Sequence, residues 1–406
     1  MTDEEAALSL LSAKAVRERA HEVLRLGREG RLAEWRVDMD RLPAAADFVA
    51  EVIRRQYPDL EIPFHARRRH FVSDGRNLWA ELAEAVGEGE GLARIGVALT
   101  IVSVLLDAGS GPGWRYTDGK TGAISSRSEG LGVASLRMFE GGAFSANPRT
   151  PLCADAARLS QLSAAELGIG FQVGPENPLL GLEGRAALLR RLGGQIAARP
   201  DLFGALGSLG DLFQTFKARA VDGRLSAPDI LAVLLEALGP IWEGRLTLGG
   251  RPLGDTWRHP ALKGDGANGS LVPLHKLSQW LAYSLIEPLT DGGLTITDID
   301  GLTGLAEYRN GGLFIDMGVL NLTDPADAAR DHAVSSPLVV GWRAMTVALL
   351  DEIAPLVRER LGVPAAVFPL AKLLEGGTWA AGRRIAKDRR EGGGPPLAIL
   401  SDGTVF

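Results

Sequence analysis

The sequence has almost no cysteine and contains no zinc-type metal motif. Cys153 is the only cysteine among 406 residues, so an intramolecular disulfide and a cysteine-based metal knuckle are both excluded. Such low cysteine usage fits a reducing compartment, and we expect a cytoplasmic protein in which Cys153 is a small buried residue. No H-E-x-x-H pair occurs, and His65 and His70 are five residues apart, so we predict neither a metal site nor a cofactor.

The sequence also lacks an excess of positive charge. Lys and Arg total 44 against 50 Asp and Glu, which gives a formal net charge of -6. A surface of this balance does not attract a polyanion, so we expect no extended nucleic-acid interface. One local basic pocket remains compatible with the composition.

Long hydrophobic runs are missing as well. The most apolar stretch, Ile95–Gly109, stays uncharged for too few residues to cross a bilayer and includes Asp107 near its end. We predict a helix buried on all sides there, and no membrane partner. The N-terminal MTDEEAALSLL is acidic and has no long apolar region, so we expect no secretory signal.

Helical periodicity dominates what is present, with 46% hydrophobic and 23% charged residues overall. The predicted helices are Leu8–Leu26, Ala44–Arg55, Leu78–Val86, Leu92–Leu106, Leu182–Ala197, Ala227–Leu238, His275–Glu287, Leu338–Leu361 and Ala366–Ala386. Extended candidates are short, namely Trp35–Met39, Arg245–Leu248 and Ala398–Phe406, and we expect them to pair into a minor sheet. The fold class is therefore mostly α.

Glycine- and proline-rich loops punctuate the chain, but none is long enough to be a free linker. We find no internal repeat. We expect residues 1–406 to form a single compact helical domain, or two lobes with a soft boundary near residue 151.

Two basic motifs invite a phosphate-binding interpretation. In GWRYTDGKTG, Trp114 stands where a phosphate loop needs glycine and no strand precedes, so we predict a polar turn. In HARRRHF, three arginines lie between aromatics. A solvated basic turn is the simpler interpretation, and an anion-binding or interdomain role is the alternative.

One predicted helix, in LHKLSQWLAYSLIEP, has two unlike faces. A core-facing stripe follows i, i+3, i+4 spacing and consists of Leu277, Trp280, Leu281, Ser284 and Leu285. The other face carries Lys276, Gln279, Tyr283 and Glu287. Those polar residues form either a solvated surface row or the wall of a polar pocket.

The following bend, DIDGLTGLAEYRNGG, concentrates charge among glycines. Asp298, Asp300 and Glu307 cannot all be buried unless cations or donors meet them, and Lys276 and Arg309 are near in sequence. The bend is either an ion-paired cap of the following helix or a substrate pocket that keeps one carboxylate active.

The whole chain resembles a fungal and bacterial protein family tied to the URC route of uracil catabolism. The resemblance extends over LLSAKAVRERAHEVL, IPFHARRRHF, LLDAGSGPGWRY, NPLLGLEGRAALLRRLG, LGDTWRHPA, LVPLHKLSQWLAYSLIEPL and DGLTGLAEYRNGG. The core also resembles the queuosine-nucleotide N-glycosylases, which are related to helix-hairpin-helix DNA glycosylases. Those enzymes have a lysine-bearing helix followed by D-I-x-x-[IL]-T-x-x-A-D-Y-R, which is matched here by Lys276 and by Asp298 to Arg309, with Glu307 in place of the aspartate.

The resemblance implies an N-glycosidase that acts on a small nucleotide-derived substrate, and the URC route suggests ribosylurea or its 5'-phosphate. An oxocarbenium-like transition state needs a carboxylate, a positioned water and help for the leaving nitrogen. We expect Glu307 to be that carboxylate, with Asp298 or Asp300 holding ribose hydroxyls or structuring the bend. The expected substrate-binding residues are Lys276, Tyr308, Arg309, Gln279, Tyr283, Trp114, Arg115, Trp257 and His259.

Other functions remain open. Another hydrolase or lyase acting on a pyrimidine-derived nucleotide intermediate, and a non-catalytic nucleotide-binding protein, fit the same residues. The sequence does not determine the oligomeric state.

Overall fold

Helices of the computed structural model, which describes residues 2–242 and 244–400, follow the predicted periodicity closely. Six predicted helices begin and end within two residues of their observed bounds, and two of these, Leu78–Val86 and Ala227–Leu238, match them at both ends. The strands of the described residues form only two-stranded sheets. The mostly α fold class is confirmed.

The chain divides into two compact units. The first comprises Met1–His65, Gly244–Trp280 and Asp298–Phe406, and the second comprises Ala66–Glu243 and Leu281–Thr297. Helix α13 (Lys276–Asp291) contributes residues to both units. Residue 151, near which we expected a soft boundary, lies inside the second unit.

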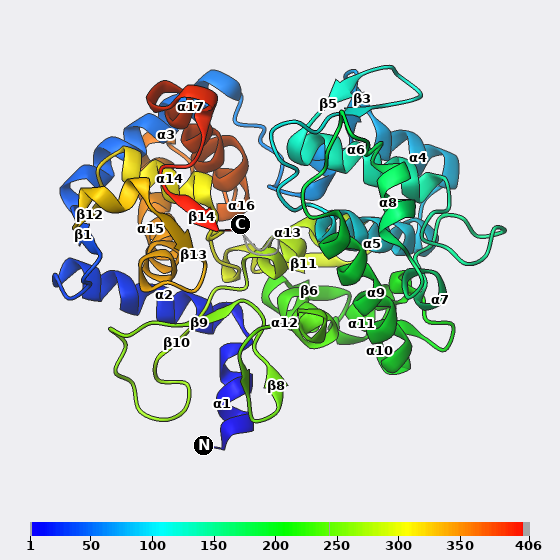
Figure 1. Cartoon of the computed structure of the whole chain (residues 1–406), viewed down its shortest axis with the longest axis horizontal. Coiled ribbons are helices and arrows are strands. Elements are labelled where there is room, and N and C mark those ends of the chain that lie inside the picture. Colours follow the sequence, from blue (N-terminus) through cyan, green and yellow to red (C-terminus); the bar gives the residue numbers. More distant parts are fainter. Residues whose placement is uncertain (1, 243, 401–406) are drawn as a thin grey trace. The chain divides into compact units, whose positions relative to one another are not determined.

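The first unit is built around the 25-residue helix α15, which packs against α2 and α3 (Figure 1). Its helices are α1 (Asp3–Leu10), α2 (Ala13–Arg28), η1 (Met39–Arg41), α3 (Leu42–Gln56), η5 (Ile299–Gly301), α14 (Tyr308–Asp316), η6 (Pro325–Ala329), α15 (Pro337–Leu361), α16 (Leu370–Lys372), the π-helical η7 (Leu373–Thr378), α17 (Trp379–Arg389) and η8 (Glu391–Gly393). Its strands are β1 (Trp35–Val37), β7 (Thr247–Leu248), β8 (Arg251–Pro252), β9 (Thr256–Arg258), β10 (Leu271–Pro273), β12 (Leu320–Leu322), β13 (Asp331–Ala333) and β14 (Ala398–Leu400).

The second unit is centred on α5, which packs against α6, α9 and α11. Its helices are η2 (Arg67–His70), α4 (Leu78–Val86), α5 (Glu90–Leu105), α6 (Arg127–Glu140), α7 (Ala156–Leu159), α8 (Ala164–Gly170), α9 (Leu182–Ala198), α10 (Pro200–Phe203), η3 (Leu209–Asp211), α11 (Leu212–Arg219), α12 (Ala227–Leu238) and η4 (Gly239–Ile241). Its strands are β2 (Val72–Ser73), β3 (Arg76–Asn77), β4 (Tyr116–Thr117), β5 (Ile124–Ser125), β6 (Arg224–Ser226) and β11 (Thr295–Thr297). All residues from Gly96 to Leu105 are buried, as predicted for a fully enclosed helix.

The predicted helix Leu8–Leu26 is split in two. Ser12 adopts an extended conformation and its hydroxyl accepts the amide of Ala15 at 3.1 Å, so it caps a new helix, α2. The three candidate strands do not pair with one another: β1 pairs with β12, β7 with β8 and β14 with β13. Residues 401–406 of the predicted last strand lie outside the described residues.

The interpretation of HARRRHF as a solvated basic turn is wrong. Arg67 is fully buried, forms an ion pair with Asp107 at 3.0 Å and donates to Ser103 at 2.7 Å. Arg68 pairs with Asp291 and Arg69 pairs with Glu287. The three guanidinium groups are therefore matched by acids within the second unit. By contrast, the DGKTG part of GWRYTDGKTG forms the predicted polar turn, between β4 and β5.

No helix of the described residues is long and apolar enough to cross a membrane.

Candidate active site

The charged bend is an irregular segment whose carbonyl groups are held by arginines. Arg17 donates to the carbonyl oxygens of Asp300, Gly301 and Leu302 at distances of 2.7 to 3.3 Å. Its guanidinium also pairs with Asp351 at 2.9 Å. Backbone groups that lie outside helices and sheets need such partners when they are buried. The segment is therefore fixed by side chains from α2 and α15.

The two aspartates of the bend have different positions. Asp298 is exposed and adopts the left-handed conformation, with φ of 50°, immediately before η5. The carboxylate of Asp300 pairs with Arg358 at 2.7 Å and accepts the amide of Leu370 at 2.6 Å. Asp300 thus joins the bend to α15 and α16.

A buried ion pair supports the residues just before Glu307. Arg343 donates to both carboxylate oxygens of Asp255 at 2.8 and 2.7 Å, and its Nε donates to the carbonyl of Ala306 at 3.3 Å. Burial raises the pKa of Asp255, but Arg343, the amide of Lys276 and the indole of Trp257 together hold this pKa well below its ordinary value. The carboxylate of Asp255 therefore stays charged at neutral pH.

Glu307 caps helix α14 and is only 9% exposed. Its two carboxylate oxygens accept the amides of Arg309 at 2.7 Å and of Asn310 at 2.6 Å. Asn310 in turn donates from its side chain to Leu305 at 3.3 Å. These contacts fix the position of the carboxylate at the positive end of the helix dipole.

An aromatic and charged cluster surrounds Trp379 and includes Arg309, two residues after Glu307. The guanidinium of Arg309 lies 5.0 Å from the ring of Tyr308 and 5.4 Å from that of Trp379. The imidazole of His65 lies 5.8 Å from the same indole and 6.2 Å from that of Trp280. His65 Nδ1 is 2.6 Å from the carboxylate of Glu375. We refer to His65, Trp280, Arg309, Glu375 and Trp379 as the Trp379 cluster.

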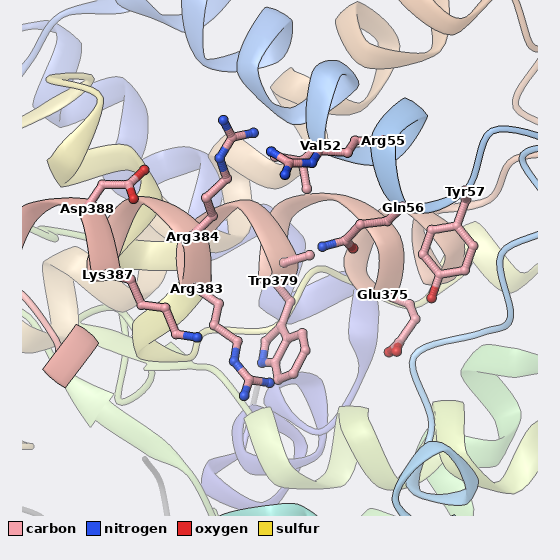
Figure 2. Close-up of a pocket in the computed structure, with 11 residues that line it drawn as sticks. Val52, Arg55, Gln56, Tyr57, Glu375, Trp379, Arg383, Arg384, Lys387 and Asp388 are labelled. Carbon is pink, nitrogen blue, oxygen red and sulfur yellow. The ribbon is translucent and has the colours of Figure 1, made fainter. Parts of the chain in front are cut away.

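A cavity of about 510 Å³ adjoins this cluster. Figure 2 shows its wall, which comes from the end of α3 and from one face of η7 and α17. Its lining residues are Val52, Arg55, Gln56, Tyr57, Glu375, Trp379, Ala380, Arg383, Arg384, Lys387 and Asp388. Its volume lies in the range of about 300–1,000 Å³ that is usual for small-molecule sites.

The structure brings the predicted residues of the first unit into two groups. Tyr308 and Arg309 contact each other at the Trp379 cluster, and Glu307 caps the helix that begins with them. Around Asp255, the backbone amide of Lys276 donates at 3.0 Å and the indole of Trp257 donates at 2.6 Å. The amide oxygen of Gln279 accepts from Thr303 at 3.4 Å.

The remaining predicted residues have local partners. His259 is buried, which lowers its pKa, and its Nδ1 accepts the amide of Ala261 at 3.2 Å. Trp114, Arg115 and Tyr283 belong to the second unit. The indole of Trp114 donates to the carbonyl of Phe171 at 2.9 Å, and the guanidinium of Arg115 donates to the carbonyls of Pro112 and Trp114.

The polar face of α13 is not a solvated row, because Gln279 and Tyr283 have no exposed surface. Glu287 pairs with Arg69. Whether this face lines a pocket stays a prediction.

Sequence analysis missed His65, Glu375, Trp379 and the cations of α17. The available signal was the i, i+4 spacing of Trp379, Arg383 and Lys387 in the segment WAAGRRIAKDRR, which places an aromatic ring and two cations on one helix face.

Comparison with known proteins finds relatives over almost the whole chain. The family model described as "Protein of unknown function (DUF1688)" matches residues 9–406. The protein described as "Protein urg3" of Schizosaccharomyces pombe is 40% identical over 415 residues, which cover 99% of both chains. "Uracil catabolism protein 4" of Lachancea kluyveri is 36% identical over 413 residues, with 93% of both chains covered.

Proposed function

Because the chain belongs to the family described as DUF1688 and is similar along its length to a uracil catabolism protein, we propose that it is an enzyme of uracil catabolism that hydrolyses an N-ribosyl bond. The proposed substrate is ribosylurea or its 5'-phosphate. Water adds its oxygen to C1 of the ribose, the C1–N bond breaks, and the departing nitrogen gains a proton. The products are urea and ribose or ribose phosphate.

The observation that carries this proposal is the fixed carboxylate of Glu307 on the segment that leads into the Trp379 cluster. This nearly buried carboxylate accepts two backbone amides, and Arg309, two residues later, lies over the ring of Trp379. The resemblance of this segment to queuosine-nucleotide N-glycosylases supports a reaction at a ribosyl carbon. A fixed, dry carboxylate is suited to stabilising an oxocarbenium-like transition state without reorganising.

We assign Glu307 the role of activating the water and stabilising positive charge on the ribose. Its helix-capping contacts leave no freedom to move away from the reacting carbon, which favours a correctly oriented attack. Arg309 supplies a guanidinium over the rings of Tyr308 and Trp379, and such a group can pair with a substrate oxyanion.

The His65–Glu375 pair is the second acid-base element of the proposed site. A carboxylate on one ring nitrogen of a histidine fixes the ring orientation and leaves the other nitrogen for a ligand. Glu375 also lines the 510 Å³ cavity. In this proposal His65 delivers the proton that the departing urea nitrogen requires.

Urea release from synthetic ribosylurea and ribosylurea 5'-phosphate tests the reaction, with wild-type protein compared with Glu307→Gln and Glu375→Gln. We expect Glu307→Gln to lower kcat by about 10²–10⁴-fold, which is the usual contribution of a positioned base. Glu359→Gln, on an exposed site of α15, is the matched control and should retain full activity. Thermal unfolding of each variant verifies folding.

The possible outcomes separate the assignments. Full activity of folded Glu307→Gln would remove Glu307 from the mechanism, and a loss confined to Glu375→Gln would transfer the base role to Glu375. If the wild-type protein binds ribosylurea phosphate and returns it intact after long incubation, the hydrolase proposal is wrong and a binding role replaces it.

A further inference from the structure

We propose that the cavity between α3 and α17 is a phosphoryl-binding site, and that the chain therefore acts on the phosphorylated form of its substrate. This inference rests on the proposed function for the identity of the substrate, but the cavity's preference for a phosphoryl group is argued from the cavity itself.

The lining residues of α17 form two adjacent rows on one helix face. Trp379, Arg383 and Lys387 are spaced by four residues, and so are Ala380, Arg384 and Asp388. Residues at i and i+4 lie above one another on a helix. The first row therefore presents an indole ring and then two cations along the cavity wall, as Figure 2 shows.

The cavity has more cationic than acidic side chains. Four cations and two acids line it, in a chain whose formal net charge is -6. One acid, Glu375, pairs with His65, and one cation, Arg384, pairs with Glu51 at 2.9 Å outside the lining. Among the residues that the structure describes, Arg55 and Lys387 form no ion pair.

Like charges held this close repel one another, and a bound anion removes that repulsion. Arg383 and Lys387 lie at i, i+4 spacing, which is unfavourable for two cations on an isolated helix. A phosphoryl group offers several acceptor oxygens, which guanidinium and ammonium groups bind through charge-assisted hydrogen bonds. The chemistry of the cavity therefore fits a phosphate monoester rather than a neutral sugar.

The aromatic side of the cavity fits the rest of such a ligand. The guanidinium of Arg383 lies 5.3 Å from the centre of the Trp379 ring. The same ring contacts the guanidinium of Arg309, which is two residues after Glu307. A sugar phosphate bound with its phosphoryl group at Arg383 and Lys387, which Figure 2 shows on the same side of α17 as Trp379, would extend along the indole ring. Its other end would then approach the Trp379 cluster, where the proposed acid-base residues lie.

Calorimetric titration tests this site without turnover. We expect the wild-type protein to bind ribose 5-phosphate much more tightly than ribose, and to bind inorganic phosphate in competition with ribose 5-phosphate. Lys387→Ala and Arg383→Gln should each weaken ribose 5-phosphate binding by about 10–100-fold, which corresponds to one lost charge-assisted hydrogen bond. Arg389→Ala, an exposed position of the same helix outside the lining, is the control and should bind normally.

Two results would overturn the inference. One is ribose binding as tight as ribose 5-phosphate binding, and the other is unchanged affinity in both folded cavity variants. A failure of the proposed hydrolysis can be distinguished from a failure of the phosphoryl site. In that case ribose 5-phosphate still binds at the cavity, but no urea is released. Conversely, if Lys387→Ala cleaves ribosylurea 5-phosphate with unchanged KM, the hydrolysis stands and the phosphoryl site does not.

Discussion

Two arginine-rich tracts of this chain have opposite environments. In the second unit, each arginine of HARRRHF has an acidic partner, and Arg67 is completely enclosed. In the first unit, the cations of α17 face a cavity in which they outnumber the acids. Basic residues are therefore neutralised by acids in the first tract, whereas they are in excess over acids on the cavity wall of the second.

The difference follows from what each tract packs against. Arg67 also donates to the carbonyl of Ser128 at 3.2 Å, so a single guanidinium joins η2, α5 and the start of α6. Buried charges of this kind require complete pairing because desolvation is costly. Cations on an open cavity wall keep their hydration and do not need partners, so an excess of them can be retained for binding.

The largest effect should come from breaking the paired tract. Arg67→Met leaves Asp107 buried without its cation, and we expect the free energy of unfolding to fall by about 3–5 kcal/mol. Thermal and denaturant unfolding measure this loss. Arg76→Met, which removes an exposed pair with Glu81 in the same unit, is the control and should cost about 1 kcal/mol or less. Equal losses in the two variants would contradict the structural role of Arg67.

A smaller, acid-dependent effect should come from another paired arginine of the second unit. Arg137 holds the pKa of Asp118 well below its ordinary value, although burial opposes this shift. The contribution is fully present above the unfolded-state pKa of about 3.9 and is lost as pH falls through the lower folded-state pKa.

Asp118→Asn should therefore cost about 1–3 kcal/mol at neutral pH. The unfolding free energies of the variant and the wild type should converge as pH falls below 4. Measurement of unfolding between pH 7 and pH 2 tests this, and a difference that stays constant with pH would refute the ionic explanation.

The smallest effect on stability should come from the cavity cations. Because their charge is in excess and solvated, Lys387→Ala and Arg55→Ala should change the free energy of unfolding by no more than about 0.5 kcal/mol. A loss as large as that of Arg67→Met would show that these cations are structural and would remove the contrast between the two tracts. Thermal unfolding without added phosphate is the appropriate measurement.

Most long helices could be predicted because their apolar residues recur at helical spacing. Helix α6 was not predicted, and it contains Gly130 and Gly132. A Cβ atom on Gly130 would lie 3.0 Å from the ring of Trp114, and one on Gly132 would lie 2.7 Å from the carbonyl oxygen of His70. These glycines permit close helix packing, which depends on partners that are remote in sequence.

The candidate site could be predicted only in part, for a similar reason. Glu307, Tyr308 and Arg309 were predicted because they lie in a charge-rich bend that resembles the motif of the queuosine-nucleotide N-glycosylases. His65 and Glu375 are 310 positions apart, and their contact at 2.6 Å depends on how η7 packs against α3 and the chain that follows it. A local pattern could not reveal such a pair, although the cation spacing of α17 could have suggested a cavity wall.

The π-helical segment η7 sets the direction in which Glu375 points relative to the cations of the following helix, α17. Two glycines of η7 pack closely against α3 and the chain that follows α3. A Cβ atom on Gly376 would lie 2.8 Å from Ile62, and a Cβ atom on Gly377 would lie 3.1 Å from Val49. A π turn holds one residue more than an α turn, and one residue corresponds to a rotation of about 100°. Glu375 lies within this turn and the cations of α17 lie after it. The extra residue of the turn therefore lets Glu375 and these cations line the same cavity. A deletion of one glycine from η7 would leave every charged side chain of the cavity in the sequence. It would still rotate Glu375 away from the cations of α17.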